Sequence, residues 1–185
     1  MKPNLTTAIH FLLFFVVMLN MTACAETQEQ KIQKLIKQLG GEDKYARMKA
    51  AHDLGQIGKP AAGAVPALMH ALKDENAETR RYAIVALGKI GEPAEEIVYD
   101  LILALKDEDA EVREHAARTL GKIGEPSKPA ILPLIEALND EEWSVRGNAA
   151  FALKAIGTPK AMKAVEEFRE KEAINTIEES KGTNQ

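Results

Sequence analysis

Leu87–Gly91 reads LGKIG, and this stretch decides the fold because the chain repeats it at a fixed interval. The other copies are LGQIG at Leu54–Gly58, LGKIG at Leu120–Gly124 and LKAIG at Leu153–Gly157, so neighbouring copies start 33 residues apart. Many positions that recur at one interval predict a solenoid, in which each repeat buries its apolar face only against its neighbours. Two charged positions recur with the motif: Asp74, Asp107 and Asp140, and Arg47, Arg80, Arg113 and Arg146.

Each repeat is predicted to form two helices. In the first helix the apolar positions are four, four and three residues apart, which places them on one face and leaves a solvated outer face. The last glycine of each copy is expected to end this helix, at Gly58, Gly91, Gly124 and Gly157, and the proline two residues later prevents it from continuing. The second helix carries five apolar positions within eight residues, as at Val98–Leu105, so we expect it to be the more enclosed helix.

The two ends of the array differ from its middle. Lys31–Leu39 has helical spacing of apolar residues and matches the second helix of a repeat, so it is predicted to be an N-terminal cap helix. The last second helix, with Ala161, Ala164, Val165 and Phe168 inward, is strongly charged on its outer side, as a C-terminal cap requires. The expected fold is an all-α, α-solenoid chain of about four repeats plus the cap helix, or about nine helices.

The first residues have a separate role. Ala8–Leu19 is an apolar run of 12 residues, which is too short to span a bilayer and has the length of a signal-peptide core. Met21-Thr22-Ala23-Cys24 resembles a bacterial lipobox, although leucine is usual where Met21 stands, and Cys24 is the only cysteine. The resemblance implies lipidation of Cys24, with palmitate among the acyl chains, and a lipoprotein anchored in the cell envelope. Because Ala25 and not aspartate follows, the periplasmic side of the outer membrane is favoured.

The alternative is a plain secretory signal that is cleaved near Ala23 or Ala25, which would leave a soluble periplasmic or secreted protein. A single cysteine excludes intramolecular disulfides. The expected organisation is a signal peptide at 1–23, a short polar tether at 24–30, a repeat domain at 31–172, and a helix end with a disordered tail at 173–185. We expect the disorder to begin at Ser180.

The pattern Asp-x5-Arg-x2-Ala-x3-Leu-Gly-x-Ile-Gly, found at Asp74–Gly91 and in the two following repeats, resembles HEAT repeats. The similarity is to the short bacterial type related to the bilin-lyase HEAT-like family, and it covers about Gln28–Glu172. It implies a right-handed superhelix with first helices on the convex side and second helices on the concave side. The related family includes enzymes that attach bilins to proteins. A secreted lipoprotein without a chromophore-site motif fits that activity poorly, so we expect a non-enzyme.

The recurring charged residues could be read as an acid–base site, but residues present in every repeat more simply serve the repeat. Each aspartate can accept from backbone N–H groups at the next helix start, and each arginine can reach such an aspartate. We interpret them as a structural ladder. The histidines occupy different positions of the repeat and show no metal-ligand spacing, so no metal and no cofactor is expected. The ladder consists of Asp74, Asp107, Asp140, Arg80, Arg113 and Arg146.

A protein-binding surface is predicted on the outward positions of the second helices, on the concave face that the resemblance implies. Its apolar centre consists of Tyr99, Leu103 and Leu132. The equivalent positions in other repeats hold proline, histidine and glutamate, so these are not core positions. The alternative is that they pack between repeats. Trp143 is a further anchor candidate, with packing at the last repeat as its alternative. The polar residues around the centre are His70, Lys73, Lys106 and Glu136.

The function expected from these features is a non-catalytic scaffold for protein–protein interaction, monomeric and attached to the membrane by its lipid. A net charge of −4 argues against general binding of nucleic acid. One alternative is a lyase-type or chaperone-like module that assists modification or assembly of a substrate protein. Another is a purely structural component of the envelope.

Overall fold

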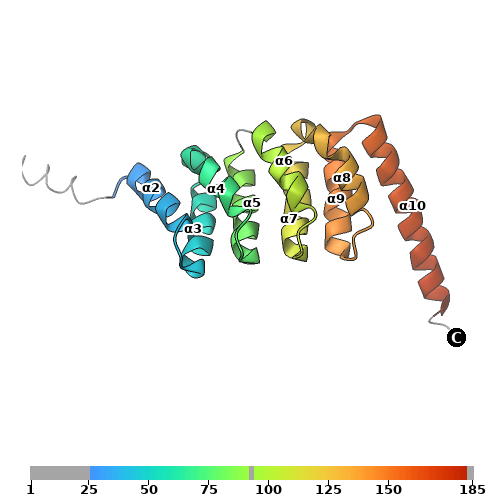
Figure 1. The fold of residues 1–185 in the computed structure, drawn as a ribbon. Coiled ribbons are helices and arrows are strands. Elements are labelled where there is room, and N and C mark those ends of the chain that lie inside the picture. The colour runs from blue at the N-terminus through green and yellow to red at the C-terminus, as the bar shows by residue number, and fades with distance from the viewer. Residues whose placement is uncertain (1–25, 92–93, 183–185) are drawn as a thin grey trace, which may run out of the picture.

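The structure is a computed structural model that describes residues 26–91 and 94–182. Throughout these residues the secondary structure is helical, and the helices stack side by side into an elongated array (Figure 1). The helices in chain order are α2 (Gln28–Leu39), α3 (Lys44–Ile57), η1 (Lys59–Ala64), α4 (Val65–Ala71), α5 (Ala77–Ile90), α6 (Ala94–Ala104), α7 (Ala110–Ile123), η2 (Glu125–Ala130), α8 (Ile131–Ala137), α9 (Trp143–Ile156) and α10 (Pro159–Gly182).

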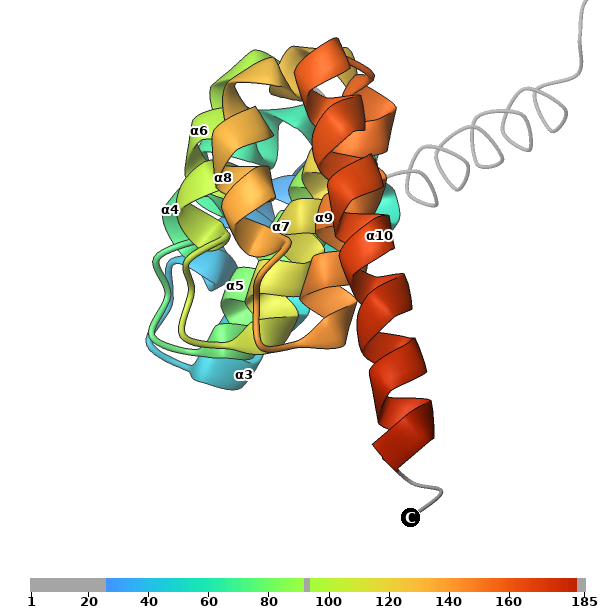
Figure 2. The same cartoon turned by 90° about the vertical axis from the view of Figure 1, so that its right-hand side faces the viewer.

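The array has two layers, which are visible when it is viewed along its length (Figure 2). The first helices of the repeats, α3, α5, α7 and α9, form one layer, and each has 14 residues. The second helices α4, α6 and α8 form the other layer, whereas α10 crosses the end of the array over α9 and also contacts α8 (Figure 2). In two repeats the second helix opens with a 3₁₀ segment, η1 or η2, that has proline in its first turn. The prediction of an α-solenoid is confirmed.

Side chains from the loops fix where the helices begin. Asn76 and Asp109 cap α5 and α7 by accepting from the backbone N–H groups of Thr79 and Val112, at 3.0 and 3.1 Å. Thr27 and Gln30 form a capping box at the start of α2. This cap starts α2 at Gln28, so the helix includes residues that we expected to belong to the tether.

The last helix, α10, extends farther than expected. It runs to Gly182 and therefore passes Ser180, where the sequence predicted the beginning of a disordered tail. Neither proline nor glycine occurs between Lys160 and Lys181, so the chain contains no residue that would break the helix earlier. No helix among residues 26–91 and 94–182 combines the length and apolar character needed to cross a bilayer.

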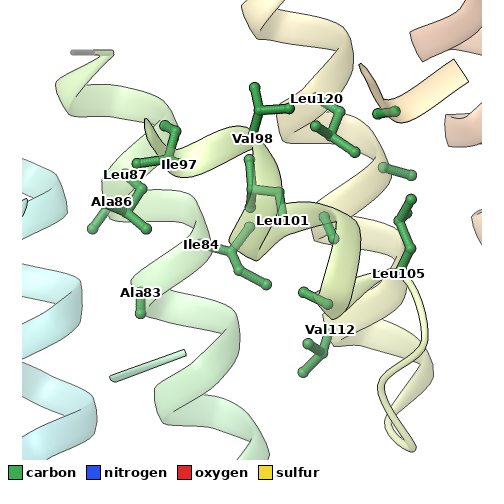
Figure 3. Packing of buried hydrophobic residues seen from close by; sticks show 14 of the residues in the cluster. Ala83, Ile84, Ala86, Leu87, Ile97, Val98, Leu101, Leu105, Val112 and Leu120 are labelled. Atoms are coloured by element: carbon green, nitrogen blue, oxygen red, sulfur yellow. The ribbon is translucent and has the colours of Figure 1, made fainter. Parts of the chain in front are cut away.

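The core lies between the two layers and runs without interruption from α2 to α10. Figure 3 shows its middle, where α5, α6 and α7 meet. There Leu101 of α6 and Leu120 of α7 are fully buried. The inner first helices α5 and α7 pack against first helices on both flanks as well as against the second layer, so they are at least as enclosed as the second helices, which we had expected to be the more enclosed ones. In α5 the buried residues are Thr79, Arg80, Ala83, Ile84, Ala86, Leu87 and Ile90, whereas in α4 they are Val65, Leu68 and Ala71.

Consecutive first helices approach each other closely at the first glycine of the repeated motif. A Cβ atom on Gly55 would lie 3.1 Å from Ala86 Cα, and one on Gly121 would lie 3.0 Å from Ala152 Cα. This glycine therefore permits close packing, whereas the second glycine ends the helix, as Gly124 does with φ 73°. The sequence had predicted the helix end at the second glycine and had not identified the packing role of the first.

Neighbouring repeats meet in both layers. Each first helix packs directly on the next, and α6 meets the following repeat at both α7 and η2. The placement of the second helices on the concave side stays a prediction.

Candidate functional site

The recurring charged residues form a continuous ladder of ion pairs between repeats. Nε and Nη2 of Arg80 donate to Asp107 Oδ2 and Oδ1 at 2.8 and 2.7 Å. Arg113 binds Asp140 in the same bidentate way, at 2.8 and 3.0 Å. Nη1 of each arginine donates to the two carbonyl oxygens of the preceding loop; for Arg80 these belong to Asp74 and Glu75. Each guanidinium thus joins the start of its own repeat to the start of the next.

The ladder begins one repeat earlier than the set expected from the sequence. Arg47 donates to both carboxylate oxygens of Asp74, at 2.6 and 3.1 Å. It was recognised as part of the recurring arginine column but was not included in the ladder. Asp74 also accepts from the backbone N–H of Asn76 at 2.9 Å, so the aspartate orders the loop that leads into α5.

Burial disfavours the charged form of Asp74, but the hydrogen bonds from Arg47 and from the Asn76 N–H outweigh it and leave the pKa of this carboxyl below its ordinary value. The pKa of Asp140 is lowered in the same way, with burial opposed by Arg113 and by the Glu142 N–H. The pKa values of Arg80 and Arg113 are raised, mainly by their hydrogen bonds to Asp107 and Asp140. The lowered pKa values of Asp74 and Asp140 favour their ionised forms, and both oxygens of each carboxylate are engaged, which suits structural residues and not an acid–base pair.

At the C-terminal end the ladder changes. Arg146 donates to the carbonyl oxygens of Asp140 and Glu141, as its counterparts do in their own loops. The position where the next aspartate would stand holds Ala173. Arg146 Nε instead lies 3.8 Å from Glu172 Oε1, which belongs to the terminal helix α10. The last rung therefore uses a carboxylate of the capping helix.

The apolar residues predicted on the second helices lie at the surface. The side chains of Tyr99 and Leu103 on α6 are each 66% exposed, and that of Leu132 on α8 is 57% exposed. Side chains exposed to this extent are not packed between repeats, so the packing alternative is not supported. Lys106 and Glu136 form an ion pair of 3.3 Å that connects the end of α6 to α8 beside this patch.

The other predicted surface residues lie elsewhere. His70 and Lys73 line an open depression of about 380 Å³ between α2 and α4, next to the Arg47–Asp74 pair. Trp143 is the first residue of α9 and is 71% exposed, so it does not pack at the start of the last repeat. It belongs to the layer of first helices and therefore not to the apolar surface formed by Tyr99, Leu103 and Leu132. Cys24 lies outside the described residues.

The sequence did not reveal a pocket of about 250 Å³ on the layer of first helices. It is lined by residues of α3, α5 and α7, and it brings His52 and His115 to one place although they come from different columns. His52 contacts the Tyr82 ring edge-on at 5.2 Å between ring centroids, and the Arg81 guanidinium lies 4.6 Å from the centre of that ring. The lining consists of His52, Gly55, Gln56, Arg81, Tyr82, Val85, Lys89 and His115.

One signal could have indicated this pocket: its residues occupy the variable outer columns of the first helices, which we had interpreted as a solvated face. Two histidines do not make a metal centre, and within residues 26–91 and 94–182 no three His, Cys, Asp or Glu side chains gather in a way that could hold a metal ion. The chemistry available in this pocket is recognition of anions by cations and of apolar groups by aromatic rings.

Comparison with known proteins identifies the repeat. The family described as HEAT repeats matches residues 32–97 and 98–178, which is most of the chain. No curated protein matches the chain.

Several solved structures have the same architecture. An engineered protein is 29% identical, with a TM-score of 0.62 over 74% of this chain and 67% of that one. The complex of CpcE and CpcF of the phycocyanin lyase from Nostoc sp. PCC7120 is 26% identical, with a TM-score of 0.57 over 76% of this chain and 86% of that one. A designed armadillo repeat protein in complex with the peptide (KR)4 is 22% identical with a TM-score of 0.59, covering 74% of this chain and 70% of that one, and shows the shared fold alone.

Proposed function

Because this chain belongs to the HEAT-repeat family, we propose that it is a non-catalytic scaffold that binds another protein in the bacterial cell envelope. The residues exposed on the surface support the proposal. The recurring charged residues are engaged with each other, as described above, and the remaining exposed aromatic and apolar residues are suited to contact a partner. Solved relatives include the complex of CpcE with CpcF, in which a repeat chain of this kind assembles with another protein.

The observation that carries the proposal is the exposure of Tyr99, Leu103 and Leu132 on neighbouring second helices. Large apolar side chains that are exposed without serving the core are typical anchors of protein interfaces. The Lys106–Glu136 pair beside them supplies a polar rim of the kind that surrounds such anchors. We call Tyr99, Leu103 and Leu132 the second-helix patch.

The test replaces Tyr99 or Leu103 with alanine and measures both thermal unfolding and capture of the crosslinked partner from the native envelope. Because both side chains are exposed, the melting temperature should change little, while partner binding should weaken by about 1 kcal/mol or more at an anchor. Tyr45→Ala is a matched control, since Tyr45 is also 66% exposed but lies on α3 in the other layer. Clear destabilisation with unchanged capture would rule out the second-helix patch as the binding surface.

A second candidate function is a lyase-type or chaperone-like module that holds a substrate protein during its modification or assembly. The similarity to the phycocyanin lyase complex favours this alternative. Dependence of partner binding on a bilin or another small molecule would distinguish it from a simple scaffold.

The proposed location rests on the sequence around Cys24. A single acyl chain binds membranes only marginally, whereas several chains, at about 0.8 kcal/mol per buried CH₂, hold a protein firmly. A lipidated Cys24 should therefore place the protein in the membrane fraction, and Cys24→Ser should prevent processing or release a soluble form. Wild-type protein found in the soluble periplasmic or secreted fraction would contradict the lipid anchor.

A further inference from the structure

Exposed cations gather on the layer of first helices, on the side opposite the second-helix patch. Lys89 of α5, Arg118 and Lys122 of α7, and Lys154 of α9 are all exposed. Among the described residues none of the four has an ion-pair partner, in contrast to the arginines of the ladder. The chain as a whole is acidic, with a net charge of −4, so this group of cations is a local feature.

The interaction with the helix dipole explains the positions of only three of these four cations. Lys89, Lys122 and Lys154 lie in the last turns of their helices, where a cation interacts favourably with the helix dipole. Arg118 is not in the last turn and is four residues before Lys122, so the two cations face each other on one side of α7. Like charges at this spacing destabilise a helix slightly. An anion bound between them would offset that cost.

The pocket lined by α3, α5 and α7 adjoins this cationic surface at Lys89. Lys89, Arg81, His52 and His115 line it, and no carboxylate does. Asp53 binds Lys49 and His52, and Arg81 pairs with Glu111 at 3.3 Å and with Glu78 at 3.6 Å. Within the described part of the chain, Lys89 is therefore the lining cation that brings an unpaired charge to the pocket. Glu114, one turn before Arg118, is the remaining acidic group on the outer face of α7.

An apolar anchor lies within the same surface. Phe151 of α9 is 50% exposed, and its ring packs on α7 at Gly121, which is next to Lys122. The ring therefore sits between the cations of α7 and Lys154 of α9. An exposed ring that is fixed by a neighbouring helix loses little entropy when a ligand covers it.

We propose that this first-helix face, consisting of Lys89, Arg118, Lys122, Phe151 and Lys154 with the adjoining pocket, binds an extended acidic segment of a partner protein. Packed helices are about 8–10 Å apart, and an extended chain advances about 3.3–3.6 Å per residue, so roughly every third residue of the segment meets a new helix. Carboxylates at that spacing can pair with the cations of α5, α7 and α9, and an apolar residue between them can cover Phe151. The inference rests on the scaffold function and adds the chemistry of the partner, on a face separate from the second-helix patch.

The experiment measures fluorescence anisotropy of the full-length protein with a labelled peptide that has Glu at every third position and Leu and Ser between. The peptide should bind, and its affinity should fall as salt concentration rises, because the ion pairs are exposed and screened. Lys89→Gln combined with Lys122→Gln should weaken binding about fivefold, as expected for the loss of two surface ion pairs. The matched control is Lys37→Gln combined with Lys73→Gln, two exposed lysines of the other layer, and should leave the affinity unchanged.

Three results would overturn the inference: no binding of the Glu peptide, equal binding of a peptide with Lys in place of Glu, or equal affinity in the Lys89→Gln and Lys122→Gln variant. Vesicles that contain phosphatidylglycerol are tested in parallel. If they bind through these lysines while the peptide does not, the face recognises a lipid surface and the assignment to a protein segment is wrong. The Tyr99→Ala variant should bind the peptide normally, so failure here leaves the second-helix patch to be judged by its own capture experiment.

Discussion

At the scale of single residues, position within the repeat determines the consequence of a substitution. Leu120 and Lys122 are two residues apart on α7, yet Leu120 is fully buried between the layers and Lys122 is exposed. The charged ladder is another example. The side chains of Arg113 and Asp140 are only 10% and 12% exposed, so their ion pair is largely removed from water, whereas Glu141 beside it is 83% exposed.

Leu120→Ala should lower the free energy of unfolding by about 2–5 kcal/mol, because it leaves a cavity in the middle of the array. Lys122→Ala should cost less than about 0.5 kcal/mol. Chemical denaturation of both variants provides the measurement, and similar losses at the two positions would mean that the faces of α7 are assigned incorrectly.

Asp140→Asn should lower the free energy of unfolding at neutral pH by about 3–5 kcal/mol, because Arg113 loses its buried counter-charge and keeps only the exposed Glu141, at 3.4 Å. Since the folded-state pKa of Asp140 is lowered, its stabilising effect is full above the unfolded-state pKa of about 3.9 and is lost as the pH falls through the folded-state value. The stability of the wild type should therefore decrease more steeply than that of Asp140→Asn between roughly pH 5 and pH 3. Denaturation across this range tests the slope, with Glu141→Gln as the control that should resemble the wild type.

At the scale of helices, small residues set how closely the elements approach. A Cβ on Gly121 of α7 would lie 2.7 Å from two ring carbons of Phe151 and 3.0 Å from Ala152 Cα, both on α9. Gly147 on α9 has no heavy atom within 4 Å of the same point, so its helix position is open. Both glycines are inside first helices, but only Gly121 is required by the packing of one helix on the next.

Glycine to alanine at these two positions should therefore have opposite effects. Gly147→Ala should raise the free energy of unfolding by roughly 0.5–1 kcal/mol, since alanine is the better helix former. Gly121→Ala should lower it by about 1–3 kcal/mol, because α9 must move to accommodate the methyl group. Thermal and chemical denaturation of both variants decide the matter, and stabilisation by both changes would show that the first helices are not tightly packed.

At the scale of the whole molecule, the two ends of the array differ from its interior in their charged residues and in how the core is covered. The ladder lacks an aspartate at each end, since Gly41 and Ala173 stand at those positions. Helix α2 covers the first repeat, and α10 packs on α9 and α8 through Ala161, Ala164 and Val165. The outer sides of both helices are polar, so the apolar core does not continue into solvent.

Removal of α10, by ending the chain at Gly157, should expose the apolar side of α8 and α9. The shortened protein should unfold at a lower denaturant concentration and associate in solution, because capping elements keep a solenoid soluble. Analytical ultracentrifugation and denaturation test this, with a chain that ends at Ile174 as the control that retains the packed part of the helix. A monomeric truncated protein with an unchanged midpoint would contradict the capping role of α10.

The sequence alone determined the solenoid, the pairing of helices in each repeat and the composition of most of the charged ladder. These features follow from contacts that recur in every repeat, so a fixed interval of 33 residues reveals them. The exposure of the second-helix patch could also be predicted from the repeat, because the repeat does not require apolar residues at the positions of Tyr99 and Leu132. Features that involve only one place in the array leave no periodic signal.

Only the tertiary structure decided how the layers are spaced and what they bring together. Three features join residues of different repeats. His52 and His115 line one pocket, the Phe151 ring packs on Gly121, and Arg146 lies near Glu172. These contacts depend on how closely neighbouring helices approach, which is set by the summed size of the side chains between them. The spacing within one repeat does not contain that information, so it became visible only when the helices were packed.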